Sequence, residues 1–178
     1  MADFTVELNG PLFKRQYLLY VIQLSHGPSD YYYVGQTGDT KEKTARPVFR
    51  RLTAHLEDRK STQNQVYQYI AHHILHCPVC EGKDTAFTGQ TRQRVEKYLV
   101  NSDVTMSAYR LEDFSQIITK TKHHEIRRRT LQIEKQVIDI LRKNKRKVIN
   151  KKSTGGKPYY PCPYPEIIIQ VKNDFLLK

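Results

Sequence analysis

Two pairs of residues near the start of the chain have the types and the spacing to act on a phosphate group. Arg51 and His55 are four residues apart in a segment of helical periodicity, so their side chains lie on one side of the helix, one turn apart. Arg51 can then bind a phosphate as a fork of donors, and His55 can hydrogen-bond or carry a proton beside it. Tyr20 and Tyr33 lie in two apolar segments whose strand alternation places both phenols on one face in a suitable register.

If such residues were to hydrolyse a phosphodiester, they would have to deprotonate a water, neutralise the charge that grows on the phosphate oxygens, and assist the leaving oxygen. A phenol has an ordinary pKa of about 10, so Tyr20 or Tyr33 needs a nearby cation to act as a base near neutral pH. Glu134 lies beside Ile133 and Val137 at the margin of an apolar helical stripe, so its carboxylate can point inward. One carboxylate, with waters and a substrate phosphate, is a usual way to hold Mg²⁺.

The composition places these residues in a strongly basic chain. Its 178 residues include 30 Lys and Arg against 18 Asp and Glu, a formal net charge of +12, which favours a polyanion as the partner. A solvated basic surface is the alternative. The length suits one domain over residues 1–178. The sequence has no apolar run long enough for a membrane span and no secretory signal at its start, so a cytoplasmic protein is expected, and three cysteines fit a reducing compartment.

The elements that must position these side chains follow from periodicity. Residues 17–24 and 31–36 are rich in aromatic and β-branched residues around a turn-forming stretch, which predicts a β-hairpin. Helical spacing predicts helices over residues 45–59, 65–76 and 123–143, and alternation predicts a strand over residues 104–111. The segment EIIIQVK, residues 166–172, is expected to form a last strand. The order predicts an α+β fold, in which helices flank a small antiparallel three-stranded sheet, with an additional C-terminal strand.

Two short motifs in the predicted hairpin resemble those that give the GIY-YIG nucleases their name. The first motif is here Leu18-Leu19-Tyr20, with Leu18 and Leu19 in place of the family's Gly and Ile. The second is Tyr33-Val34-Gly35, which continues as Gln36-Thr37-Gly38-Asp39. In the family a helix with Arg, a later helix with Glu and then an Asn follow. The matching residues in this sequence are Arg51 with His55, Glu134 in LQIEKQVIDIL and Asn150 in KVINKK.

The resemblance implies a GIY-YIG fold with a partly helical insertion at about 57–103 and a C-terminal extension at about 151–178. It implies a metal-dependent DNA endonuclease in which Glu134 holds one Mg²⁺ or Mn²⁺ ion. Tyr20 would be the favoured base, Tyr33 a contact to water or phosphate, and Asn150 a structural or phosphate contact. Because no separate DNA-binding domain is evident, a type II restriction-like enzyme is expected, and double-strand cleavage favours a homodimer.

Other interpretations of the same residues stay open. Tyr20 and Tyr33 could pack at the edge of a core, and Arg51 and His55 could be surface residues. Glu134 could pair with one of the arginines at positions 127–129. At the level of function, the alternatives are a phage or mobile-element nuclease of loose specificity and a non-catalytic nucleic-acid-binding module.

The insertion carries two further groups of candidate residues. Cys77 and Cys80 have the spacing of half a zinc site, against the alternative of ordinary reduced thiols. Further zinc ligands could come from His72, His73, His76 and Cys162. Side chains of the kinds that read base edges are also present, although a solvated polar segment fits them equally well. These candidates are Gln63, Asn64, Gln65, Gln90, Arg92 and Arg94.

Overall fold

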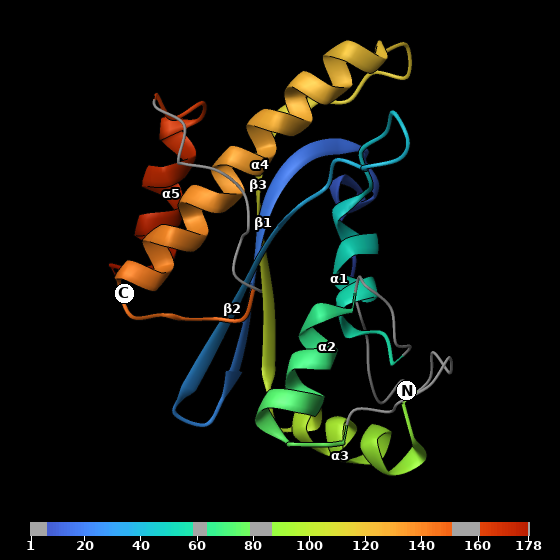
Figure 1. Ribbon diagram of the computed structural model, residues 1–178, viewed down its shortest axis with the longest axis vertical. Coiled ribbons are helices and arrows are strands. Elements are labelled where there is room, and N and C mark those ends of the chain that lie inside the picture. The colour runs from blue at the N-terminus through green and yellow to red at the C-terminus, as the bar shows by residue number, and fades with distance from the viewer. Residues whose placement is uncertain (1–6, 59–63, 79–86, 151–160, 178) are drawn as a thin grey trace.

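A four-stranded mixed sheet lies at the centre of the computed structural model, which describes residues 7–58, 64–78, 87–150 and 161–177 (Figure 1). Its strands are β1 (Gln16–His26), β2 (Ser29–Gln36), β3 (Asp103–Asp113) and the short β4 (Lys147–Val148), in the order β3-β1-β2-β4. The first three are antiparallel, and β4 runs parallel to β2. The α+β class and the three predicted antiparallel strands are therefore confirmed, and the sheet is mixed because the short parallel strand β4, which was not predicted, extends it.

The predicted hairpin is formed by β1 and β2, and its register decides how the two phenols lie. Tyr20 is opposite Gly35 and Ile22 is opposite Tyr33. Because strand residues two apart share a face, Tyr20 and Tyr33 lie on the same side of the sheet. Gly27 adopts a φ of 55° in the connecting turn, a conformation that glycine takes without strain.

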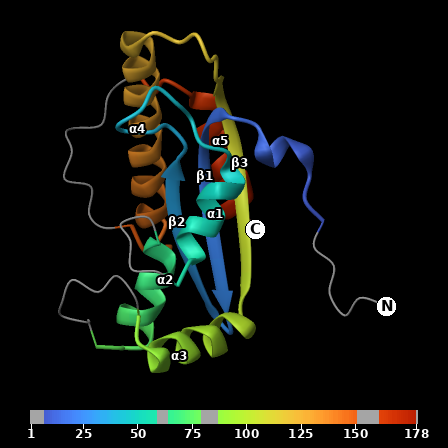
Figure 2. The same ribbon diagram turned by 90° about the vertical axis from the view of Figure 1, so that its right-hand side faces the viewer.

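Helices cover both faces of the sheet (Figures 1 and 2). Leu18, Tyr20 and Ile22 of β1 pack in one core with residues of α1 (Val48–Leu56) and α2 (Gln65–Tyr69). The alternating residues Leu19 and Val21 pack on the other face with α4 (Lys120–Lys143) and α5 (Pro165–Phe175). Since both sets of side chains are buried, β1 reads in the sequence as a continuous apolar run.

The predicted strand over residues 166–172 was wrong, because this segment forms α5. Three consecutive isoleucines suggested a strand, yet the buried residues Ile167, Val171 and Phe175 recur every four positions. Pro165 occupies the first turn of the helix, where its missing N–H costs nothing. Ile169, on the opposite side of α5, is 60% exposed, so the helical period and not β-propensity decided the structure.

The insertion between α1 and β3 is more helical than its sequence indicated. After α2, a one-turn π-helix, η2 (Ile70–Ile74), completes the predicted helix over this region. A further helix, α3 (Gly89–Val100), lies where no regular element was predicted. Its buried side is limited to Thr91, Val95 and Tyr98, too few apolar residues to produce a clear helical pattern. Thr88 caps α3, since its hydroxyl accepts the N–H of Thr91.

A short 3-10 helix, η1 (Gly10–Phe13), precedes β1 and contacts α1. The predicted helices over residues 45–59 and 123–143 are confirmed as α1 and α4, with shorter and slightly longer bounds respectively. In the part of the chain that the structure describes, no helix has both the length and the apolar character needed to cross a membrane.

Candidate active site

Three aromatic side chains meet between β1, β2 and α1. The hydroxyl of Tyr20 and Nε2 of His55 are 2.9 Å apart, which is a hydrogen bond between buried groups. The ring of Tyr33 lies 4.3 Å from that of His55 and 6.3 Å from that of Tyr20, measured between ring centroids. Neither phenol is more than 7% exposed, so both tyrosines belong to the core and to this cluster at once.

The close approach of Tyr20 explains why the second motif ends in a glycine, Gly35. A Cβ atom at this position would lie 2.4 Å from both Cζ and Oη of Tyr20, far inside van der Waals contact. The phenol end of Tyr20 therefore occupies the space above the Gly35 backbone. Any side chain at Gly35 would displace the Tyr20 hydroxyl from His55, so the glycine positions the phenol by leaving room for it.

Arg51 of α1 and Glu134 of α4 lie within electrostatic range of both phenols. Burial, with smaller contributions from its neighbours, raises the pKa of Tyr20 well above its usual value. Burial and then the Glu134 carboxylate also raise the pKa of Tyr33, and Arg51 opposes both increases. Glu134 comes from the helix on the opposite face of the sheet, so the cluster joins side chains from both layers.

The Glu134 carboxyl is itself partly buried, and this burial raises its pKa to about 7. The positive charges of Arg127 and Arg51 act in the opposite direction and favour the ionised form. Nε of Arg51 is buried and has no hydrogen-bond partner within the described residues. A bound cation would favour the ionised form of the Glu134 carboxyl. A bound anion, such as a phosphate, would accept the unused Nε–H of Arg51.

Asn150 lies beside the cluster and makes a structural contact. Its Oδ1 accepts the backbone N–H of Val34 at 2.8 Å, and its Nδ2 donates to the Val34 carbonyl oxygen at 2.7 Å. Val34 stands between Tyr33 and Gly35, so the Asn150 amide fixes the backbone of the second motif. Asn150, one of the six residues expected from the sequence, thus binds the protein backbone through its side chain.

Arg127 was not among the predicted site residues, although it lies beside the cluster. It precedes Glu134 by two helical turns, and its guanidinium donates to the Thr40 hydroxyl at 3.0 Å. Its Cγ is 3.6 Å from the position of a Cβ on Gly38. The helical spacing to Glu134 was visible in the sequence, but the contact with the loop after β2 depends on tertiary structure.

The loop that follows β2 is held by Asp39, which is 7% exposed. Burial alone would raise the pKa of Asp39, but hydrogen bonds from the N–H groups of Lys41 and Glu42 and from Arg46 hold it below its usual value. Oδ2 of Asp39 lies 2.8 Å from Nε and 2.6 Å from Nη2 of Arg46. The loop therefore delivers Arg46 in a fixed orientation beside the start of α1.

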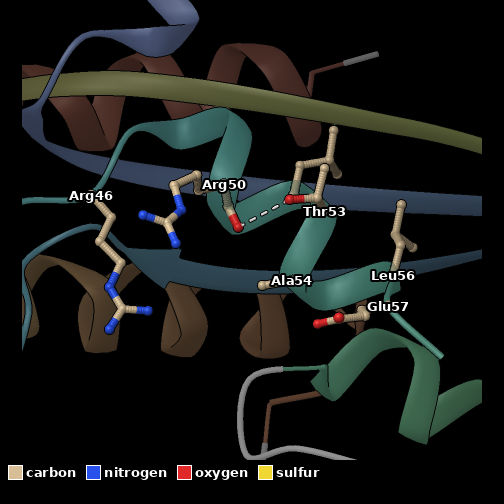
Figure 3. A pocket seen from close by; sticks show the side chains of 7 residues that line it. Arg46, Arg50, Thr53, Ala54, Leu56 and Glu57 are labelled. Atoms are coloured by element: carbon tan, nitrogen blue, oxygen red, sulfur yellow. Dashed lines mark hydrogen bonds between the residues drawn. The ribbon is translucent and has the colours of Figure 1, made fainter. Parts of the chain in front are cut away.

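An open pocket of about 590 Å³ lies along α1 (Figure 3). Arg46 and Arg50 reach toward one end of the pocket and Glu57 lies toward the other. The lining residues Arg50 and Thr53 share one side of α1, and Glu57 follows directly after the helix. Arg51 and His55 occupy a different side, so this pocket is separate from the aromatic cluster.

Glu134 is the carboxylate of the cluster that could bind a divalent cation. Within the residues that the structure describes, no three His, Cys, Asp or Glu side chains form a metal-binding group. Mg²⁺ is often held by one or two carboxylates, with water and substrate oxygens completing its coordination. Glu134 provides one such carboxylate, and it lies within electrostatic range of the Tyr20 and Tyr33 hydroxyls.

Cys80, one of the two cysteines of the zinc hypothesis, lies outside the described residues. Cys77 is a buried free thiol, and Nδ1 of His72 is 3.2 Å from its carbonyl oxygen. Among the suggested base-reading residues, Gln63 is also outside the described part. Asn64 is buried and donates to the Glu57 carbonyl oxygen, and Arg92 pairs with Asp58 at 3.2 Å. Asn64 and Arg92 therefore have structural contacts.

Comparisons with protein-family models, with curated proteins and with solved structures find no match to this chain.

Proposed function

We propose that the protein is a metal-dependent endonuclease of the GIY-YIG type, which hydrolyses phosphodiester bonds in DNA. The observation that supports this proposal most is that two phenols, a histidine, an arginine and a carboxylate lie in one cluster. These side chains come from β1, β2, α1 and α4. Each residue type has a use in phosphodiester hydrolysis, and the net charge of +12 suits a polyanionic substrate. The ordered sequence motifs lead to the same reaction class.

In this proposal Tyr20 and His55 move the proton of the attacking water. Tyr20 Oη accepts a proton from water while its own phenolic proton passes to Nε2 of His55, 2.9 Å away. This relay uses the tautomer of His55 in which Nε2 carries no hydrogen and can accept the phenolic proton. It also suits a phenol with a raised pKa, because a free phenolate never needs to accumulate. The water oxygen then forms the new P–O bond as the bond to the leaving oxygen breaks.

Arg51, Tyr33 and Glu134 would arrange the substrate. The buried Nε of Arg51 has a donor available for a phosphate oxygen, and the Tyr33 hydroxyl can hydrogen-bond to water or phosphate. Glu134 would hold a Mg²⁺ or Mn²⁺ ion, which neutralises charge on the phosphate and the leaving oxygen when bound. Arg127 would favour the ionised Glu134 that metal binding requires.

Within this class we propose a type II restriction-like enzyme that acts in the cytoplasm. A site with one such cluster cuts one strand at a time, so cleavage of both strands would use a homodimer or two successive nicks. The insertion that contains α2 and α3 would supply sequence recognition.

The test is incubation of plasmid DNA with the full chain and Mg²⁺, repeated with Glu134→Gln. The matched control is Glu125→Gln, on the same helix, whose carboxylate pairs with Lys122 at 3.2 Å. We expect cleavage by the wild type and the control and a loss of at least 100-fold with Glu134→Gln. Discrete fragments support a restriction enzyme, and a smear supports a nuclease of loose specificity. DNA binding without cutting under any divalent metal would contradict the proposal and favour a binding module.

A further inference from the structure

Two arginines approach the Glu134 carboxyl group from the two helical layers of the protein. Arg51 belongs to α1 and Arg127 to α4, and these helices lie on opposite faces of the sheet (Figure 2). Both guanidinium groups lie within electrostatic range of Glu134. Within the part of the chain that the structure describes, neither arginine forms an ion pair. Two positive charges thus share one carboxyl group, so at least one of them has no counter-ion there.

A second half-buried arginine of α4, Arg129, shows how this helix neutralises a guanidinium that serves structure. Arg127 and Arg129 point to different sides of α4, because they are two positions apart. Nη2 of Arg129 lies 2.5 Å from Oε1 of Glu112 and 3.8 Å from Oε1 of Glu125. Arg127 instead donates to an uncharged group, the Thr40 hydroxyl, at 3.0 Å. The charge of Arg127 is therefore held in place without being neutralised.

The loop between β2 and α1 fixes the direction of the Arg127 side chain. The position of a Cβ atom on Gly38 lies 3.6 Å from Cγ of Arg127, so the aliphatic stem packs against this loop. Thr40, in the same loop, accepts one of the five N–H donors of the guanidinium. This hydrogen bond lies at the exposed surface, so a ligand can reach the end of the side chain.

We propose that Arg127 and Arg51 form a two-arginine clamp, which binds one phosphate group of the DNA backbone beside Glu134. This inference rests on the proposed nuclease function, because it adds a phosphate-binding residue to the site of that enzyme. A guanidinium binds a phosphate through two parallel N–H···O bonds, and a side chain that is already fixed loses less entropy on binding. The positive charge of the clamp comes from side chains, so a phosphate should bind to it without a metal ion.

Substitution by lysine separates direct phosphate binding from an effect that Arg127 exerts only through Glu134. Arg127→Lys keeps the positive charge that favours the ionised carboxylate of Glu134, but an ammonium group cannot form two parallel hydrogen bonds to a phosphate. Arg127→Met removes the charge and keeps an unbranched side chain. If Arg127 acted only on the ionisation of Glu134, Arg127→Lys would behave as the wild type does.

The test measures phosphate binding and DNA cleavage separately, with the full chain. The rise of Tm with the concentration of inorganic phosphate, in EDTA and at constant ionic strength, gives the affinity for phosphate. The Tm without phosphate shows that each variant folds. Cleavage of plasmid DNA with Mg²⁺ gives kcat/KM for the same proteins. The matched control is Arg128→Met, which removes the same charge from the next, exposed residue of α4.

We expect the wild type and the Arg128→Met control to bind phosphate equally well. Arg127→Met and Arg127→Lys should bind it about 10- to 100-fold more weakly, the usual effect of losing hydrogen bonds to a charged group, and kcat/KM should fall by a similar factor. The clamp is overturned if the wild type binds no phosphate in EDTA, if Arg127→Lys equals the wild type, or if Arg128→Met loses as much as Arg127→Met. Phosphate binding that depends on Arg127, in a protein that cuts no DNA with any divalent metal, would contradict the nuclease proposal alone.

Discussion

At the scale of single residues, the cluster is built around protonated phenols in the core. Burial raises the pKa of both Tyr20 and Tyr33, so neither is an effective base by itself near neutral pH. In the proposed relay, the hydrogen bond between Tyr20 and His55 allows His55 to accept the phenolic proton. The chemistry is therefore expected to depend on the pair and not on either residue alone.

Tyr20→Phe tests this pairing, since it removes the hydroxyl and keeps the ring. We expect kcat to fall by about 10²- to 10⁴-fold, the usual contribution of a positioned acid or base. DNA affinity should change little. Tyr17→Phe is the matched control, because Tyr17 also belongs to β1 and forms a buried hydrogen bond with a histidine, His123, at 2.6 Å. Equal losses of activity in the two variants, measured by single-turnover cleavage, would contradict a chemical role for Tyr20.

Gly35→Ala tests the position of the phenol without removing it. The added methyl group would overlap the Tyr20 ring, so we expect a loss of at least 10²-fold in cleavage and a destabilisation of about 1–3 kcal/mol from overpacking. Gly10→Ala, where nothing lies within 4 Å of the new atom, should leave both unchanged. Unfolding in urea and plasmid cleavage measure the two effects. A fully active Gly35→Ala protein would show that the close approach has no role.

Glu134 should make the stability of the protein depend on pH, because its pKa of about 7 in the folded protein exceeds the ordinary value of 4.5. The folded state favours the protonated form, so the free energy of unfolding should decrease as pH rises from about 4.5 to 7. Glu134→Gln should therefore raise Tm at pH 8, by about 2 to 4 °C for each kcal/mol relieved, and leave Tm unchanged at pH 4. The rate of cleavage, which needs the ionised carboxylate, should rise through pH 7. Calorimetry that finds the same Tm difference at both pH values would refute this.

At the scale of elements, the strongest periodic signals were sufficient to identify the hairpin, α1 and α4. Residues 166–172 were misassigned because a run of isoleucines carries both strand propensity and a helical period, and contacts with β1 and α4 decide between them. α3 was missed because its buried side contains only three residues. The contact of Arg127 with Thr40 could not be predicted either, since it joins residues 87 positions apart.

The helical structure of α5 can be checked by two substitutions. Val171 is fully buried, whereas Ile169 is 60% exposed. In a helix these residues lie on different sides, but in a strand they would share a face. Val171→Asp should destabilise the protein by more than about 3 kcal/mol, because it buries an unpaired charge, and Ile169→Asp should have little effect. Denaturant titrations that find equal effects would favour the strand.

At the scale of the whole molecule, the net charge of +12 should make nucleic-acid binding strongly dependent on salt. The logarithm of the binding constant for duplex DNA should fall by about 0.9 for each phosphate contact per tenfold increase in salt. Raising NaCl from 50 to 200 mM should therefore weaken binding by at least 10-fold. Fluorescence anisotropy with a labelled duplex measures this dependence, and an affinity that is independent of salt would contradict a role for the basic surface.

The contact between Asn150 and Val34 has a further consequence for how the protein behaves in a crowded solution. β4 covers β2 only at Tyr31 and Tyr32, and an uncovered strand invites a second polypeptide chain to pair with it. The Asn150 amide occupies both the N–H and the carbonyl of Val34, the next groups that a foreign strand would use. The Asn150 side chain thus blocks the addition of a further strand at this edge of the sheet, which protects the molecule against self-association through the edge.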